Sequence, residues 1–204
     1  LLDNATVKCW GRSASGQLGY SDTVTRGDGA GEMGNALPAI SFAAGRTATA
    51  IAAGANHTCA LLDNARVVCW GDNAYGQLGQ GNMYNIGDRT GSTVAATPTI
   101  DLGTGRTAVA ISAGDLHTCA LLDNATVKCW GMSSNGRLGT GDTNDLGDDP
   151  AEMGDALLPI NLGTGLSAVA VTTGSEHTCV LLTNTNLKCF GNGMDGRLGY
   201  GNRN

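Results

Sequence analysis

The sequence lacks the features of a membrane-spanning, nucleic-acid-binding or unstructured chain. No apolar run approaches the roughly 20 residues that a membrane helix needs, so we expect no membrane span. The net charge is −6, with lysine and arginine scattered along the chain, so we expect no nucleic-acid partner. Only 15% of the residues are charged and 41% are hydrophobic, a composition typical of a packed protein rather than a disordered tail.

Helical spacing of apolar residues is also missing over any stretch of ten or more positions, which argues against a helical fold. A repeat of sixty residues is present instead. The motif His-Thr-Cys-Ala-Leu-Leu begins at His57 and at His117, and a close variant begins at His177. The chain opens at Leu1 inside a further copy. A period of this length, built from strand-sized pieces, is typical of propellers and solenoids.

Each unit contains four strand-sized pieces. In the first complete unit, residues 36–42 are a short apolar stretch and residues 47–54 are rich in small and β-branched side chains. Residues 57–71 have the pattern of a hairpin, with Asn64 at a tip that suits positive φ. Apolar groups lie on both faces of these strands, as a sheet packed between two other sheets requires. The prediction is an all-β chain of four-stranded antiparallel β-propeller blades.

We expect three complete blades with partial repeats at the two ends. The predicted units are a partial first repeat holding the last strand of a blade and a linker, two blade repeats, and a final blade repeat with a truncated linker: 1–34, 35–94, 95–154 and 155–204. The chain begins inside a repeat without methionine and ends shortly after repeating its own beginning. We therefore interpret it as a fragment, a processed product or a segment of a longer repetitive polypeptide.

The seven cysteines predict disulfides inside the hairpins. Cys59 and Cys69 are equidistant from Asn64, so a symmetric hairpin places them opposite each other and within bonding distance. The same symmetry recurs twice, and the predicted pairs are Cys59–Cys69, Cys119–Cys129 and Cys179–Cys189. The alternative is small buried thiols in a reducing cytosol, but recurrence of both partners favours bridges and an extracellular or cell-surface location. Cys9 is left over, and we predict that it is unpaired or bonded to another chain.

No enzyme chemistry is expected. The histidines occur once per repeat at one position, without convergent metal ligands, and are predicted to be framework residues: His57, His117 and His177. One aromatic position also recurs, and we predict that its residues pack between blades: Trp10, Trp70, Trp130 and Phe190. No serine lies in the context of a catalytic nucleophile. Asn-x-Thr sequences provide three candidate glycosylation sites: Asn4, Asn56 and Asn124.

The linkers are the least similar parts of the units and are expected to be surface loops, where binding function usually resides: 20–36, 81–97 and 141–157. The third is the most acidic and partly resembles a calcium-binding loop, but Met153 stands where a bidentate glutamate belongs. Its aspartates are candidates for holding a hard cation: Asp142, Asp145, Asp148 and Asp149. A solvated acidic loop is the alternative. We predict no cofactor and keep Ca²⁺ as the alternative.

The sequence WGDNAYGQLG at 70–79 resembles the signature of the regulator of chromosome condensation repeat family, a Trp-Gly and an Asn followed by Gly-Gln-Leu-Gly. Residues 10–20, 130–141 and 190–201 match it with substitutions. The resemblance covers essentially the whole chain and implies four-stranded blades in a β-propeller, usually seven in a closed ring. The paired cysteines and the acidic linker depart from the family pattern and point toward bacterial-like extracellular members.

The resemblance leaves several functions open, since the family includes a nucleotide exchange factor on chromatin, a plant ultraviolet photoreceptor and secreted bacterial inhibitors of β-lactamases. This chain lacks the basic surface of the first and the clustered tryptophans of the second. We predict a non-catalytic extracellular structural or adhesive protein that assembles through open blade ends into a larger propeller, polymer or filament. Its partners would be copies of itself or further repeats of the same polypeptide. The alternatives are a secreted protein-binding module, inhibitor-like or receptor-like, and a carbohydrate-binding surface protein.

Overall fold

The computed structural model describes residues 1–201 and is an all-β chain, as predicted. Nine strands within that range form three antiparallel sheets of three strands each. The strands are β1 (Ala48–Ala53), β2 (His57–Leu62), β3 (Val67–Gly71), β4 (Ala108–Ala113), β5 (His117–Leu122), β6 (Val127–Gly131), β7 (Ala168–Thr173), β8 (His177–Leu182) and β9 (Leu187–Gly191). Three single 3₁₀ turns accompany them: η1 (Val94–Ala96), η2 (Ser134–Gly136) and η3 (Met194–Gly196). No helix of the described residues is long and apolar enough to cross a membrane.

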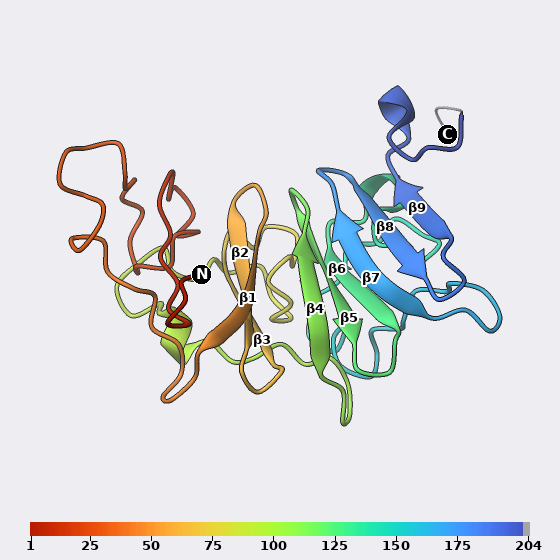
Figure 1. Ribbon diagram of the computed structural model, residues 1–204, viewed down its shortest axis with the longest axis horizontal. Helices are drawn as coiled ribbons and strands as arrows, with labels where there is room; N and C mark the ends of the chain where they lie inside the picture. Colours follow the sequence, from red (N-terminus) through yellow and green to blue (C-terminus); the bar gives the residue numbers. More distant parts are fainter. Residues whose placement is uncertain (202–204) are drawn as a thin grey trace.

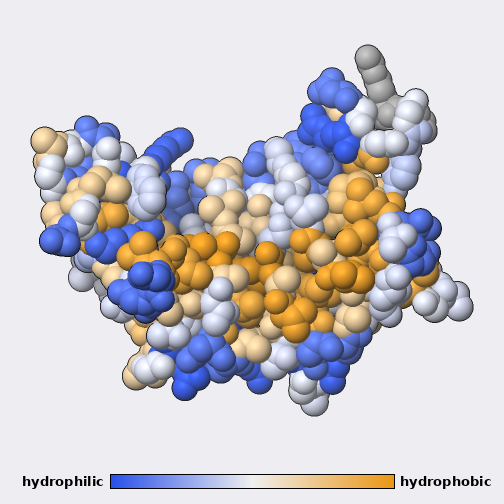
Figure 2. Space-filling model, viewed as in Figure 1, coloured by the Kyte–Doolittle hydropathy of each residue, from blue (hydrophilic) through white to orange (hydrophobic). Residues whose placement is uncertain are grey.

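The three sheets stand side by side as propeller blades (Figure 1). Each blade is ordered from an inner strand to an outer one, and the inner strands β1, β4 and β7 are neighbours along the row. Figure 2 shows an apolar band that crosses the face formed by these inner strands. Val109 of β4 and Val169 of β7 are exposed. The first forty residues and the third blade lie at opposite ends of the row.

The hairpins have the predicted register, but their tips differ from the prediction. Positive φ falls on Ala65 (φ 60°) and on its equivalents in the other repeats, not on Asn64. The side chain of Asn64 instead accepts a hydrogen bond from the backbone N–H of Arg66 at 3.3 Å. Asn64 therefore stabilises the turn through its side chain, and the next residue, Ala65, adopts the left-handed conformation.

The predicted fourth strand of each blade is not formed, which corrects the expectation of four-stranded sheets. The apolar stretches predicted to form this strand each donate only one backbone hydrogen bond to the last strand of the preceding repeat unit. In the second of them, the N–H of Ile100 donates to the C=O of Val67 in β3 at 2.8 Å. Pro98 stands two residues before Ile100, and Pro38 and Pro159 precede the equivalent isoleucines. Proline has no N–H to donate, so it interrupts a ladder. These segments stay in place mainly by burying side chains such as Ile100.

Adjacent blades pack face against face. The face of the first blade that carries its disulfide packs against the second blade in a shared cluster. The cluster contains Cys59, Leu61, Val67 and Cys69 from the first blade, with Ala108, Ala120, Leu122 and Trp130 from the second. A similar cluster joins the second blade to the third. Trp130 is fully buried at the junction between the first and second blades, and Trp70 is fully buried where the first blade packs against the N-terminal partial repeat, as predicted, but Trp10 is 61% exposed. The prediction for Trp10 is wrong because no blade within the described residues covers its face.

Candidate functional site

A buried hydrogen-bond chain crosses each junction between complete blades. Thr118 Oγ1 donates to the carbonyl oxygen of Gln77 at 2.9 Å, so the same hydroxyl accepts the Nε2–H of His57 at 2.9 Å. The proton of the neutral ring is therefore on Nε2, and the buried Nδ1 lone pair has no donor among residues 1–201. The next junction repeats the chain with His117, Thr178 and the carbonyl of Arg137.

Burial determines the charge state of these histidines. Desolvation lowers the pKa of His57 from 6.5 to about 4, and the negative charge of Asp115 opposes only part of this. Desolvation also lowers the pKa of His117 from 6.5 to about 3, with a smaller contribution from the positive charge of Arg137. Both rings are neutral near pH 7 and serve to join blades.

Each junction histidine lies against a glycine, which makes that glycine hard to replace. A Cβ atom on Gly114 would overlap the ring of His117 and lie 2.6 Å from the carbonyl oxygen of Gly174 in the next blade. Overpacking of this kind costs about 1–3 kcal/mol. We expect Gly114→Ala to lower the free energy of unfolding by that amount, measured by urea denaturation with the disulfides intact.

Gly174→Ala is the matched control for this prediction. A Cβ on Gly174 would meet only the ring of His177 among its nearest neighbours, and His177 is partly exposed on a blade that has no following blade within the described residues. The ring can move aside, so the loss should be clearly smaller. Equal losses in the two variants would show that the junction carbonyl is not what restricts Gly114.

Each complete hairpin contains one disulfide. The cysteines face each other in the ladder with Cα atoms 4.1 Å apart, a spacing typical of an antiparallel pair that is not hydrogen-bonded. The bridges are Cys59–Cys69, Cys119–Cys129 and Cys179–Cys189. They lie on the side of each blade that meets the following blade. Cys9 occupies the equivalent of Cys69 and is a half-buried free thiol.

The outward face of the third blade is apolar and uncovered. Leu181 is 37% exposed and Leu187 is 57% exposed. The residues at the same positions in the first two blades are buried by the blade that follows them: Leu61 and Val67, Leu121 and Val127. The third blade therefore presents, at one end of the row, the same surface that joins blades elsewhere in the chain.

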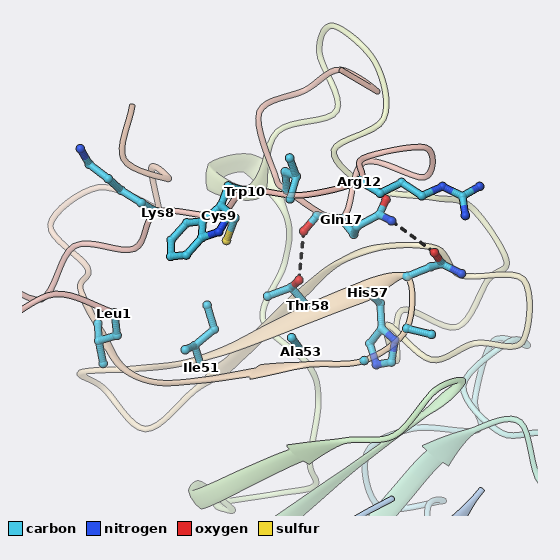
Figure 3. Close-up of a pocket in the computed structure, with 14 residues that line it drawn as sticks. Leu1, Lys8, Cys9, Trp10, Arg12, Gln17, Ile51, Ala53, His57 and Thr58 are labelled. Carbon is cyan, nitrogen blue, oxygen red and sulfur yellow. Dashed lines mark hydrogen bonds between the residues drawn. The ribbon is translucent and has the colours of Figure 1, made fainter. Parts of the chain in front are cut away.

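A groove of about 540 Å³ lies at the other end of the row, between residues 8–18 and the strands β1 and β2 (Figure 3). Cys9 lines one side of this groove, and Ile51 and Ala53 of β1 line the other. Thr58 lies at its base and donates its hydroxyl hydrogen to the carbonyl oxygen of Gln17 at 3.0 Å. We call this cavity the N-terminal groove.

Two of the four aspartates predicted as cation ligands accept hydrogen bonds from backbone N–H groups. Asp142 accepts the N–H of Asn144, and Asp145 accepts the N–H of Ser133 at 2.7 Å. Asp148 Oδ1 is buried without a hydrogen-bond partner among residues 1–201. Within the same range, no three His, Cys, Asp or Glu side chains are grouped closely enough to hold a metal ion. Asp142 and Asp145 therefore help to fix the conformation of the backbone around them.

The three candidate glycosylation sites differ in exposure. Asn4 and Asn124 are exposed on hairpin tips, where their side chains accept hydrogen bonds from the threonines of the same motif. Asn56 is partly buried and accepts a hydrogen bond from Gln17 Nε2 at 3.2 Å. A glycan on Asn56 would compete with a contact between repeats, whereas the two tip asparagines are accessible.

Sequence reasoning missed the threonine that follows each histidine. Thr58, Thr118 and Thr178 provide the hydroxyls around which the junctions are organised. The signal was their recurrence beside His in every unit. The linkers are partly or fully exposed over most of their length, as predicted. The backbone of Gly147 and Asp148 nevertheless lies so close to Gly76 of the previous repeat that Gly76 has no room for a side chain.

Stacked antiparallel blades with junctions of this kind define the chain as a β-propeller repeat protein. The model of the regulator of chromosome condensation (RCC1) repeat matches residues 6–61 and 64–121, more than half of the chain. A second model of the same repeat matches residues 48–77 and 108–137. The chain belongs to the RCC1 repeat family, as the sequence motifs predicted.

Several known proteins are similar to this chain over nearly all of its length. The ultraviolet-B receptor UVR8 of Arabidopsis thaliana is 31% identical over 206 residues, which cover 100% of this chain and 41% of the receptor. The crystal structure of human WBSCR16 superposes with a TM-score of 0.71 at 18% identity, covering 100% of this chain and 47% of that chain. Yeast RCC1 (Prp20), solved with Kap60 bound, gives 0.64 at 22% identity, covering 94% and 41%. The chain thus spans less than half the length of these relatives, and the two structures support the fold alone.

Proposed function

We propose that this chain is a non-catalytic, extracellular protein-interaction segment whose end faces bind further blades of the same repeat type. The partners would be copies of this chain or further repeats of the same polypeptide, in a larger propeller, polymer or filament. Propellers of RCC1-like repeats are a protein-interaction type of module. The exposed Leu187, whose equivalents are buried wherever another blade follows, is the observation on which the proposal rests.

Two further features support the proposal. Three disulfides in a chain of this size favour an oxidising environment, outside the cytosol. His57 and His117, whose side chains would be the natural general bases, are buried in blade junctions and bonded to threonines. An exposed apolar face of this kind is typical of a surface that binds protein.

The test is self-association of the chain, measured by analytical ultracentrifugation over a range of concentrations under non-reducing conditions. We expect concentration-dependent assembly of the parent chain and its loss in Leu187→Asp, because a carboxylate on the end face would have to be desolvated on docking. Leu158→Asp is the matched control, since Leu158 is 72% exposed and lies beside Thr140 and Leu146, which follow the second blade.

Assembly that survives Leu187→Asp, or that Leu158→Asp abolishes equally, would contradict end-face docking. A parent chain that is monomeric at every concentration, and that does not bind an isolated blade-pair fragment offered as partner, would also contradict it. The control separates a general effect of added charge on solubility from an effect at the end face.

The linkers support a second candidate, a secreted protein-binding module of the inhibitor or receptor type. Tyr84 and Met83, both in the second linker, are well exposed, and aromatic and methionine side chains are enriched in protein interfaces. A stoichiometric complex with a soluble protein that is abolished by Tyr84→Ser, but not by Leu187→Asp, would favour this candidate.

A further inference from the structure

A cavity of about 370 Å³ lies between the two ends of the third linker. Its apolar walls include the side chains of Leu146, Leu157 and Leu158, and its polar lining includes Thr140 and Asp142. Ligand sites ordinarily combine apolar walls with a few polar groups. A cavity of about 150 Å³ lined by apolar side chains is enough to hold benzene, so this cavity has room for one aromatic ring.

The first repeat shows what fits the equivalent space, because a tyrosine occupies it there. Tyr20 stands at the position of Thr140, and Pro38 stands at the position of Leu158. The hydroxyl oxygen of Tyr20 lies 3.0 Å from the carbonyl oxygens of both Cys9 and Pro38. The same oxygen accepts the N–H of Cys9 at 3.2 Å. A phenol group therefore joins the strand segment to the end of the linker.

The other repeats keep this link in whole or in part, except the third linker. The hydroxyl of Tyr200 bonds to the N–H and the C=O of Cys189, at 2.9 Å each. In the second linker, the side chain of Gln80 donates to the carbonyl oxygen of Pro98 at 3.1 Å. Thr140 is shorter, and its hydroxyl donates to an aspartate of its own linker. The cavity follows from the small residue at this position.

The short side chain also leaves a buried backbone position without a partner. Cys129 is 2% exposed and faces its disulfide partner in a pair that is not hydrogen-bonded, so its N–H and C=O point to the outer edge of the sheet. On one side of it along this edge, the C=O of Val127 accepts the N–H of Ile160. On the other side, Gly131 bonds to Leu146. No hydrogen bond from residues 1–201 reaches the N–H or C=O of Cys129 between them, and buried backbone groups are rarely left unpaired.

The cavity wall favours a ligand without charge. In the first repeat, the guanidinium of Arg26 stacks over the ring of Tyr20 at 4.3 Å. Leu146 takes the place of Arg26 in the third linker, since each bonds to the equivalent glycine. An aromatic ring in the cavity would therefore meet an apolar side chain. The carboxylate of Asp142 lines the same cavity and would repel an anion.

We propose that this cavity binds a small neutral phenol, a single aromatic ring that carries a hydroxyl group. The ring contacts Leu146 and Leu157. The hydroxyl takes the place of the Tyr20 hydroxyl, because it accepts the N–H of Cys129 and donates to the carbonyl oxygen of Leu158. The site is formed within one repeat and lies apart from the end faces, so the inference goes beyond the proposed function and does not depend on it.

The experiment is a titration of the intact, ¹⁵N-labelled chain with p-cresol under non-reducing conditions, followed by NMR of the backbone amides. We expect saturable shifts at Thr140 and Leu146, with a dissociation constant of order 0.1–1 mM for a ligand of this size. The amide proton of Cys129 should move downfield, because it gains a hydrogen-bond acceptor. Toluene lacks the hydroxyl and should bind about fivefold more weakly, with the Cys129 amide nearly unchanged.

Variants of Thr140 test the position of the ligand. Thr140→Tyr supplies a phenol from the chain itself, as Tyr20 does, and should abolish p-cresol binding. It should also raise the midpoint of urea denaturation, because the new side chain fills a cavity and pairs a buried backbone group. Thr140→Ser leaves the space open and is the matched control, which should bind p-cresol as the parent chain does.

Equal binding of p-cresol and toluene, with an unmoved Cys129 amide, would overturn the proposal, since the cavity would not recognise a hydroxyl. Binding that survives Thr140→Tyr would also overturn it, because the ligand would then lie elsewhere. N-acetyltyrosine amide provides a further arm, and tighter binding of this compound than of p-cresol would contradict a free phenol in favour of a partner's tyrosine side chain. Leu187→Asp tests a different surface, so this proposal and the proposed function can fail separately.

Discussion

Replacing Trp130 by alanine is expected to lower the free energy of unfolding by about 3–5 kcal/mol, whereas the same replacement at Trp10 should cost less than about 1 kcal/mol. The two residues occupy the same position of the repeat. Trp130 is fully buried and lies in the junction cluster with Leu78 and Ile100. Its Nε1–H donates to the carbonyl oxygen of Gln77 at 3.1 Å. Trp10 is mostly exposed.

The alanine variant leaves a cavity between two blades and also removes a donor from a buried carbonyl. The carbonyl of Gln77 keeps its bond from Thr118, so the cavity should dominate the loss. Trp130→Phe separates the two contributions, because it retains most of the ring volume and loses the N–H. We expect it to cost about 1–2 kcal/mol. The third blade already carries Phe190 at this position.

The measurement is urea denaturation of the parent chain and of Trp130→Ala, Trp130→Phe and Trp10→Ala under non-reducing conditions. Tryptophan fluorescence and circular dichroism monitor the unfolding. The Trp10→Ala variant controls for the loss of a fluorophore, because it removes the same reporter group from an open position. A loss at Trp10 as large as that at Trp130 would contradict the assignment of these residues to a covered and an uncovered face.

The repeat made much of the fold predictable from sequence. Hairpin symmetry about Asn64 placed Cys59 opposite Cys69, because register in an antiparallel pair follows from equal distances to the turn. Apolar residues on both faces of β2 indicated packing on two sides, and all six of its residues are buried. These inferences required only local geometry and its repetition.

The outer strand and the turn could not be predicted in the same way. The stretch that ends at Ile100 has a strand-like composition, but whether it forms a ladder depends on where Pro98 removes a donor. The choice between Asn64 and Ala65 for positive φ depends on which residue bonds to the backbone with its side chain. Residue type alone would assign the positive φ to Asn64. The hydrogen bond from the Arg66 N–H to the Asn64 side chain places the positive φ at Ala65 instead.

The candidate site was only partly visible from the sequence. An unpaired Cys9 followed from counting, but the groove beside it depends on how the first forty residues fold against β1 and β2. The role of Thr58 depends on the direction of its hydroxyl bond to Gln17. Both are long-range properties, which a repeat pattern implies only after the packing of one complete junction is known.

The blade junctions should also make the protein sensitive to acid. Well above pH 6.5, the imidazoles of His57 and His117 bind almost no proton in either the folded or the unfolded chain, so they contribute almost no dependence on pH. Below 6.5 the unfolded chain takes up protons that the folded chain excludes. The folded pKa values are about 4 for His57 and about 3 for His117. The free energy of unfolding therefore falls as the pH is lowered through this window.

Each histidine contributes a slope of about 1.4 kcal/mol per pH unit within its window. Two such groups amount to a loss of order 5 kcal/mol between pH 6.5 and pH 4. The charges that face them are few. Asp115 lies near His57 and favours protonation, whereas Arg137 and the neighbouring histidines oppose protonation of His117. A proton added at the ring Nδ1 would find no acceptor among the described residues.

The double variant His57→Gln, His117→Gln isolates this effect, because the glutamine amide can still donate to Thr118 and Thr178 and does not titrate. We expect urea midpoints of the parent chain to fall steeply from pH 6.5 to pH 4 and those of the double variant to stay nearly level until the carboxylates begin to titrate. Desolvation at the junctions is the largest cause of the lowered histidine pKa values. If the parent and the double variant lose stability in parallel, the acid sensitivity arises elsewhere and the neutral junction histidine is not its source.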